Sequence, residues 1–261
     1  MQTLRFATDH ILSYTEYGSP EGFPILVQHG LIASIKDGVL FERLVRSGAR
    51  VICIARPGYG ESSPYVMCTV AEWGEMVAGL VKELRLTRFD VLGMSSGAPY
   101  SYAIGQALPD AARNIYIFSG IPAMYDDEVL AQWPFEVKKD TNLAEMKKLA
   151  HELFFSNLSA EDVARNDMHD SMANYGFGIA LDFRLRCLDW GFRLAEVKQQ
   201  VFMRHARFDG NVPLTTAEKT AALLANVELR VDENDIHFSP ETLDAFIETE
   251  IIPRMPVREY A

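Results

Sequence analysis

Two adjacent serines stand between two glycines in the stretch Gly93–Gly97, whose sequence is GMSSG. Ser95 has a glycine two residues before it and another two residues after it. This G-x-S-x-G spacing is typical of a nucleophilic serine on a sharp turn from a strand into a helix. Side chains at the flanking positions would clash where strand and helix pass, and glycine has none. The spacing predicts that Ser95 attacks an acyl carbon while the Ser96 backbone N–H stabilises the oxyanion.

A nucleophilic serine needs a base, and the base needs an orienting acid. Of the six histidines, His237 lies after the last predicted strand, at the edge where parallel sheets bind ligands, and is the predicted base. His205 continues an apolar strand end and is predicted to be packed. Asp209 precedes a Gly-Asn turn after that strand and is the predicted acid, although an Asp before Gly also caps turns. The rival acids Glu233 and Asp235 are too close in sequence to His237 to approach its far ring nitrogen easily.

The loop that follows the first buried apolar run, VQHGLIAS at residues 27–34, is predicted to complete the site. Gly30 lets the backbone come close to Ser95, so the Leu31 N–H is the predicted second oxyanion donor. The preferred role for His29 is structural, holding this loop through hydrogen bonds. His29, Gly30 and Trp190 are also the predicted lining of the substrate site.

The elements that must position these residues follow an alternating pattern. Compact apolar runs that stop at a glycine or a polar turn are typical of strands buried on both faces of a parallel sheet; they are Phe23–Gly30, Arg50–Gly58, Arg88–Ser96 and Asn114–Gly120. His10–Tyr17 alternates like a half-buried strand. Helix-length amphipathic stretches lie between the runs, at Lys36–Ser47, Val70–Leu86 and Gly97–Leu108, with Thr69 as an expected N-cap and Glu72 three residues later. Alternating strands and helices predict a doubly wound α/β sheet.

This alternation stops after Gly120 and resumes near residue 195. The intervening stretch is helical in pattern and rich in aromatic residues. The later stretch predicts two more strands, at Gln199–Arg207 and Asn226–Val231, and two more helices, at Thr215–Ala225 and Pro240–Ile251. We therefore expect a core made of residues 1–120 and 195–261, with a mostly parallel sheet and helices on both faces. Residues 121–194 are expected to form a helical cap over one end of that sheet. Its aromatic side chains suggest an apolar substrate pocket of modest size, although a stripe of aromatic residues more often forms the core of such a cap.

Composition excludes several classes of function. The chain has 261 residues, 48% of them hydrophobic, and a formal net charge of −11, so it should repel nucleic acid and anionic membrane surfaces. No stretch approaches the ~20 apolar residues of a membrane span, and the first ten residues lack the apolar core of a signal peptide, so a cytoplasmic protein is expected. The scattered cysteines predict no disulfide framework and no zinc site. We expect a small-molecule substrate and no metal or cofactor; the oligomeric state stays open, with a homodimer among the options.

The chain resembles the α/β-hydrolase superfamily, in its cap-bearing branch of small esterases and prolyl aminopeptidases. The resemblance covers nearly the whole chain and is carried by the stretches Gly18–Gly30, Ala55–Ser63, Gly93–Asp110 and Asp189–Pro213. It implies a triad of Ser95, Asp209 and His237, with backbone oxyanion donors at Leu31 and Ser96. The chain departs from the family at His205 and Ile236, where glycine is usual, so the loops around them need not follow the family's geometry.

The resemblance implies hydrolysis of a small carboxylic ester or related acyl substrate through an acyl-enzyme. A prolyl-type aminopeptidase and a C–C bond hydrolase use the same triad and remain alternatives. A non-catalytic ligand-binding protein of the same fold is an alternative of another class. An aminopeptidase would need buried acids for the substrate ammonium, and the candidates after residue 120 are Asp126, Asp127, Glu128, Glu152 and Glu161.

Overall fold

The computed structural model describes residues 1–7, 9–137 and 142–256, and these form one sheet with the strand order β1-β2-β4-β3-β5-β6-β7-β8. The strands are β1 (Gln2–Ala7), β2 (His10–Tyr17), β3 (Phe23–Gln28), β4 (Ala49–Ile54), β5 (Phe89–Met94), β6 (Ala112–Phe118), β7 (Gln200–Ala206) and β8 (Val227–Asp232). β1 and β2 pair antiparallel at one edge, and the strands from β4 to β8 in the sheet order pair parallel. The predicted mostly parallel sheet is confirmed.

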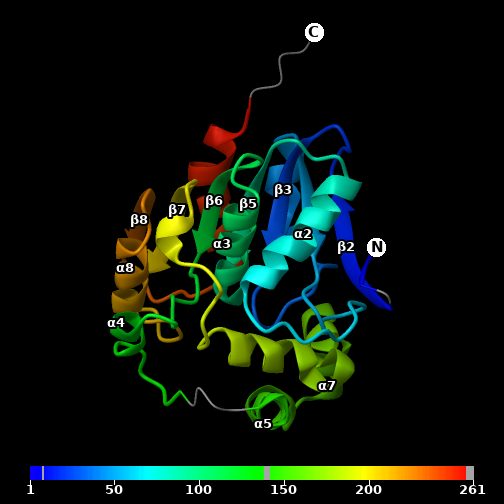
Figure 1. Cartoon of the computed structure of the whole chain (residues 1–261), viewed down its shortest axis with the longest axis vertical. Coiled ribbons are helices and arrows are strands. Elements are labelled where there is room, and N and C mark those ends of the chain that lie inside the picture. Colours follow the sequence, from blue (N-terminus) through cyan, green and yellow to red (C-terminus); the bar gives the residue numbers. More distant parts are fainter. Residues whose placement is uncertain (8, 138–141, 257–261) are drawn as a thin grey trace.

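Helices cover both faces of this sheet because alternate strand residues are apolar on each side. One buried cluster joins strand residues such as Ile117 to α2 (Ala71–Glu83), α3 (Ala98–Ala107) and the end of α8 (Leu214–Ala222). The other cluster, which includes Phe118, packs against α1 (Glu42–Arg46) and α9 (Pro240–Phe246). Figure 1 shows α2 and α3 together on one face. No helix in the described parts of the chain is both long and apolar enough to cross a membrane.

A helical segment lies between β6 and β7, across the carboxyl ends of the parallel strands. Its α-helices within the described residues are α4 (Asp127–Leu130), α5 (Leu143–Ala150), α6 (Ala160–Ala164) and α7 (Asn166–Leu185). Figure 1 shows α5 and α7 at the end of the sheet opposite the C-terminus. The Ala33 N–H, in the loop after β3, donates to Ser171 Oγ of α7 at 3.1 Å. This segment therefore faces the edge at which the predicted site residues lie; its division from the core as a separate cap stays a prediction.

Several predicted elements differ from the structure. The expected helix at Lys36–Ser47 is a 3-10 turn at Gly38–Phe41 followed by the short α1. Thr69 does not cap α2: Val70 takes the N-cap position, and the Glu72 carboxylate instead accepts the backbone N–H groups of Cys68 and Thr69. The helix expected over residues 240–251 ends as α9 at Phe246 and continues as a wider π-helical turn at Ile247–Ile251. β1 was not predicted from the sequence.

Candidate functional site

Ser95 occupies the turn between β5 and α3 in a left-handed backbone conformation, with φ of 48°. This conformation is unusual for a residue with a side chain and marks a strained turn. A Cβ atom at Gly93 would overlap Ser101 Oγ, and one at Gly97 would overlap the Gln28 carbonyl oxygen. Both glycines are thus required by close contact, and the turn presents the Ser95 side chain at the carboxyl edge of the sheet.

His237 joins Ser95 to Asp209 across this edge. Its Nε2 lies 3.0 Å from Ser95 Oγ, and its Nδ1 lies 2.7 Å from Asp209 Oδ2. The second carboxylate oxygen, Oδ1, accepts the backbone N–H groups of Asn211 at 2.8 Å and Val212 at 3.0 Å. Asp209 can therefore be both the predicted acid and the cap of the turn, because one carboxylate oxygen caps the turn while the other faces His237.

The electrostatics of Asp209 favour a carboxylate. Burial raises the pKa of this carboxyl group, but the hydrogen bond and charge of His237 and the Val212 and Asn211 N–H groups lower it more, so the pKa lies below its usual value. The carboxylate can thus hold the Nδ1–H of His237 without taking the proton. Glu233, one of the rival acids, is instead paired with Arg207 at the surface.

His205 supports the turn that carries Asp209. Its ring is fully buried, and its Nε2–H donates to the Val212 carbonyl oxygen at 2.7 Å, with Asp209 Oδ2 3.5 Å away. Burial lowers the pKa of His205, so the imidazole is neutral near pH 7. A histidine at a position where the family usually has glycine therefore packs under the acid-bearing turn.

Gly30 and His29 bring a second loop to Ser95. A Cβ atom at Gly30 would lie 3.9 Å from Ser95 Cβ and from the Met94 carbonyl oxygen, so this backbone passes directly beside the serine. The buried His29 ring accepts the Arg56 N–H at Nε2 (3.2 Å), which leaves the proton on Nδ1 for the Gly30 carbonyl oxygen (2.8 Å). Burial and the Arg56 charge lower the pKa of His29 well below its usual value. His29 thus holds the loop, as its structural interpretation predicts.

A buried ion pair that no sequence motif predicts connects this loop to α7. Arg56 is 1% exposed, and its NH2 group donates to Asp182 Oδ2 at 2.7 Å and to the Gly30 carbonyl oxygen at 2.9 Å. The Asp182 carboxylate also accepts the hydroxyls of Tyr59 at 2.9 Å and Tyr100 at 2.6 Å. Burial and the Asp182 charge raise the pKa of both tyrosines, so both stay protonated donors. One sequence signal for this pair was available. Asp182 is a single acid in the apolar stretch GIALDF, and an acid in such a stretch is buried only when it is paired.

A narrow cavity lies beside the start of α3, and its volume of about 10 Å³ is close to the space that one water molecule needs. It is lined by Val70, Ser96, Pro99, Tyr100, Ile121, Asp182 and Arg186. Ser96, the residue after Ser95, is part of this lining. Trp190 is absent from the lining: its ring is fully buried and packs edge-on against Tyr125 at a centroid distance of 4.9 Å. We therefore correct its role from substrate binding to packing of the helical segment.

The acids that could hold a substrate ammonium are not buried in the helical segment. Asp126 caps α4, and the other candidates are exposed, namely Asp127, Glu128, Glu152 and Glu161. Among the described residues of the segment, the buried acids are Asp170, paired with Lys36, and Asp182, paired with Arg56. Both carboxylates already have a cationic partner. Within the described residues, no three His, Cys, Asp or Glu side chains form a group that could hold a metal ion.

Known proteins resemble this chain along most of its length. A family model described as the alpha/beta hydrolase fold matches residues 24–242. A 2-hydroxy-6-oxononadienedioate/2-hydroxy-6-oxononatrienedioate hydrolase from Cupriavidus pinatubonensis is 24% identical over 209 residues, which cover 73% of this chain and 70% of that protein. Two solved esterases, each 19% identical, share the fold. The one from Exiguobacterium antarcticum has a TM-score of 0.68 over 92% of this chain and 96% of its own. The one from Thermogutta terrifontis has a TM-score of 0.70 over 95% and 97%.

Proposed function

The chain belongs to the α/β-hydrolase fold family, and on that premise we propose that it is a serine hydrolase acting on a small carboxylic ester or a related acyl substrate. The observation that carries the proposal is the unbroken line of hydrogen bonds from Asp209 through His237 to Ser95, with the serine on a strained turn. A serine, a base and an orienting acid in hydrogen-bond contact are the elements of acyl transfer through a covalent intermediate.

The proposed mechanism has two steps at one serine. Ser95 Oγ attacks the substrate carbonyl carbon while His237 Nε2 takes the hydroxyl proton, and the Asp209 carboxylate holds Nδ1–H of the resulting imidazolium. His237 then gives the proton to the leaving group, which departs as the carbonyl of the acyl-enzyme reforms. Water attacks the acyl-enzyme in the same way, with His237 Nε2 as the base, and the product acid leaves Ser95 free.

The Leu31 and Ser96 N–H groups are the proposed donors to the oxyanion. The peptide unit between Gly30 and Leu31 is planar, so fixing the Gly30 carbonyl also fixes the direction of the Leu31 N–H. That carbonyl accepts hydrogen bonds from both the Arg56 guanidinium and the His29 ring. In this proposal Arg56 and His29 are positioning residues, and Asp182 extends the same support to α7. We treat residues 121–194 as the cap that shapes the substrate pocket.

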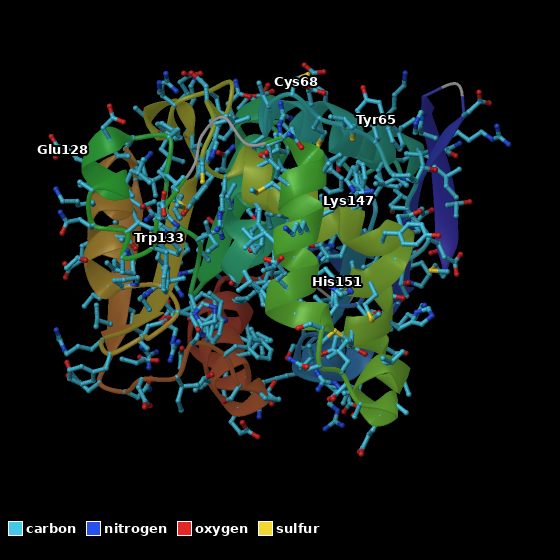
Figure 2. All side chains as sticks on the ribbon, turned by 90° about the horizontal axis from the view of Figure 1, so that it is seen from below. Tyr65, Cys68, Glu128, Trp133, Lys147 and His151 are labelled. Carbon is cyan, nitrogen blue, oxygen red and sulfur yellow. The ribbon has the colours of Figure 1, made fainter. Side chains whose placement is uncertain are left out.

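Initial rates on p-nitrophenyl esters of increasing acyl length test the proposal. We expect wild-type protein to hydrolyse the short esters and His237→Ala to lower kcat/KM by about 10³-fold or more, since the base is lost. His151→Ala is a matched control, because this histidine is exposed and lies on the helical segment (Figure 2). A folded wild type that hydrolyses no ester would favour the ligand-binding alternative.

A second candidate, hydrolysis of a C–C bond, is favoured by the names of two relatives. Hydrolases named for 2-hydroxy-6-oxononadienedioate, from Cupriavidus pinatubonensis and Pseudomonas putida, are 24% and 25% identical over 73% and 78% of this chain. Ser95, His237 and Asp209 could also cleave the C–C bond beside a ketone if a carbon group left in place of the alcohol of an ester. A direct comparison of kcat/KM for that keto acid and for the best ester separates the two candidates. A keto-acid value at least tenfold above the ester value would replace the esterase proposal.

A further inference from the structure

Arg204, on β7, is a buried cation beside the loop that carries His237. It is 2% exposed, and its strand lies between β6 and β8 in the sheet (Figure 1). Its Nε–H donates to Asp232 Oδ2, at the end of β8, at 2.7 Å. Its guanidinium carbon lies 4.8 Å from the ring centre of Phe118, the last residue of β6. Arg204 therefore contacts both neighbouring strands near their carboxyl ends, where the proposed catalytic residues lie.

Further donors of this guanidinium hold the loop between β8 and α9. The Nη1 group donates to the Ile236 carbonyl oxygen at 3.0 Å, and the Nη2 group donates to Asn234 Oδ1 at 3.3 Å. The same Asn234 oxygen accepts the Ile236 N–H at 3.0 Å, so the main chain of Ile236 is held on both sides. The peptide unit between Ile236 and His237 is planar, so fixing this carbonyl also fixes the start of the His237 backbone. Arg204 thus acts on the backbone of the proposed base.

The loop that carries His237 has little packing of its own. Residues 233–238 are each exposed or half-buried. A segment with few buried apolar contacts depends on its hydrogen bonds for a fixed position. Phe238 contacts Phe118 edge-on at a centroid distance of 6.1 Å, and the Arg204 guanidinium lies over the same Phe118 ring. The arginine is therefore a buried group on which the position of this exposed loop depends.

Arg204 is also connected to the backbone of Ser95. Its Nη1 group donates to Ser119 Oγ at 3.0 Å, and the Ser119 N–H donates to the Arg204 carbonyl oxygen at 2.9 Å. Ser119 is fully buried and has a left-handed backbone conformation, with φ of 48°. Two residues later, the Ile121 N–H donates to the Ser95 carbonyl oxygen at 3.0 Å. One guanidinium thus lies between the segment that holds the serine turn and the loop that holds the histidine.

We propose that Arg204 is a positioning residue: it sets the place of His237 Nε2 relative to Ser95 Oγ by joining the two segments that carry these residues. This inference rests on the proposed function and adds a residue that acts through the base. The planar guanidinium presents its donors in fixed directions to acceptors on three different segments, which the single ammonium of a lysine does not. Loss of Arg204 should therefore slow proton transfer from Ser95 to His237 and leave substrate binding almost unchanged.

Steady-state kinetics on p-nitrophenyl acetate separate this role from a purely structural one. Arg204→Met removes every donor, and we expect kcat to fall by about 100-fold, the scale of a small misplacement of a reacting group, while KM changes by less than about threefold. Arg204→Lys keeps the charge and should still lose about tenfold or more in kcat. Arg113→Met is the matched control, because Arg113 also holds a buried carboxylate, that of Asp90, and a backbone carbonyl, that of Arg254, but at the amino end of β6. It should lower the free energy of unfolding and leave kcat within about threefold of wild type.

A milder variant tests the proposal if Arg204→Met does not fold. Asn234→Ala removes the oxygen that accepts from both Arg204 and the Ile236 N–H, at a half-buried loop position. We expect kcat to fall by about threefold or more with KM unchanged, whereas Asp235→Ala, at the exposed neighbouring position, should keep the wild-type kcat. A smaller loss in both folded Arg204→Met and Asn234→Ala, or an equal loss in Arg113→Met, would overturn the proposal.

The ring ¹⁵N shifts of His237 provide a readout that needs no turnover, because they show which ring nitrogen carries the proton. We expect the proton on Nδ1 in wild type, held by Asp209, and a signal averaged over both tautomers in Arg204→Met. Arg113→Met should give the wild-type shifts. This pattern supports the positioning role even if no ester is hydrolysed, in which case only the proposed function fails. Unchanged His237 shifts in folded Arg204→Met contradict the positioning role even if the wild type is an active hydrolase.

Discussion

Buried polar groups have more complete hydrogen bonding at the carboxyl edge of the sheet than on α7, the helix that faces it. At the edge, each Asp209 oxygen has a donor, and His237 is held at both ring nitrogens. On α7, Asp182 has a full set of donors, but the buried Nε atom of Arg186, four residues later and so on the same side of the helix, has no hydrogen-bond partner among the described residues. The fully partnered groups hold the side chains of Ser95, His237 and Asp209 in one fixed geometry.

The largest effect should come from removing the serine oxygen. Ser95→Ala is expected to lower kcat/KM for esters by about 10⁴-fold or more, because the covalent step is lost while binding and oxyanion donors remain. Initial rates measure the loss. Ser96→Ala is the matched control: it keeps the backbone donor and should stay within about tenfold of wild type, since only a small side chain of the cavity is removed. Equal losses in the two variants would contradict the assignment.

Asp209→Asn should have the next largest effect, about 10³- to 10⁴-fold in kcat, because the amide cannot hold His237 in the required tautomer. The turn should persist, since the amide oxygen can still accept the Asn211 and Val212 N–H groups. Stopped-flow ester hydrolysis together with circular dichroism measures both properties. Asp235→Asn, at an exposed position in the loop before His237, should retain wild-type rates. Retention of wild-type activity in Asp209→Asn would contradict the assignment of Asp209 as the acid that orients His237.

The Arg56–Asp182 pair should affect stability more than chemistry. Arg56→Met leaves the Asp182 carboxylate buried without its cation, and removing one partner of a buried pair costs about 3–5 kcal/mol. Urea unfolding gives the change in the free energy of unfolding. Arg43→Met removes an exposed arginine paired with Glu248 and Asp244, and we expect a change within about 0.5 kcal/mol. Similar losses in the free energy of unfolding for the two variants would show that the buried pair stabilises the fold no more than an exposed pair does.

The smallest predicted effect is a decrease in the free energy of unfolding at acidic pH. Burial lowers the pKa of His29, so below about pH 6.5 the unfolded chain binds a proton there that the folded chain does not. The free energy of unfolding therefore falls as the pH falls, by up to about 1.4 kcal/mol per pH unit for this imidazole. Urea unfolding between pH 7 and 5 should show a shallower slope for His29→Asn than for wild type. His151→Asn, at an exposed position, should keep the wild-type slope; an unchanged slope in His29→Asn contradicts the neutral histidine.

Local patterns accounted for the sheet and for the residues around Ser95. β2 spans the same residues as the alternating run that predicts it, because side-chain alternation is a property of each strand alone. Gly93 and Gly97 could be interpreted from sequence because the strand-to-helix turn itself creates their contacts. His237 and Asp209 were located by their places after successive strands, since parallel strands end at one edge.

The partners that the sequence analysis missed are joined only by tertiary folding. Arg56 and Asp182 are 126 residues apart, and no local motif relates them. Trp190 is an aromatic residue in an aromatic-rich segment, and its pattern does not distinguish a pocket wall from a packed core. Its ring lies near Tyr102, Tyr125 and Phe192 because the return to β7 folds back over α3. Such contacts depend on the orientation of the helical segment, which periodicity alone does not define.

The most direct test of the account is covalent labelling of the folded protein with a fluorophosphonate probe, followed by peptide mass spectrometry. We predict a single adduct on Ser95, formed in wild type and lost in His237→Ala, because the serine is nucleophilic only when His237 takes its proton. An adduct on another residue, or no adduct on a folded wild type, would contradict the assignment of Ser95 as an activated nucleophile.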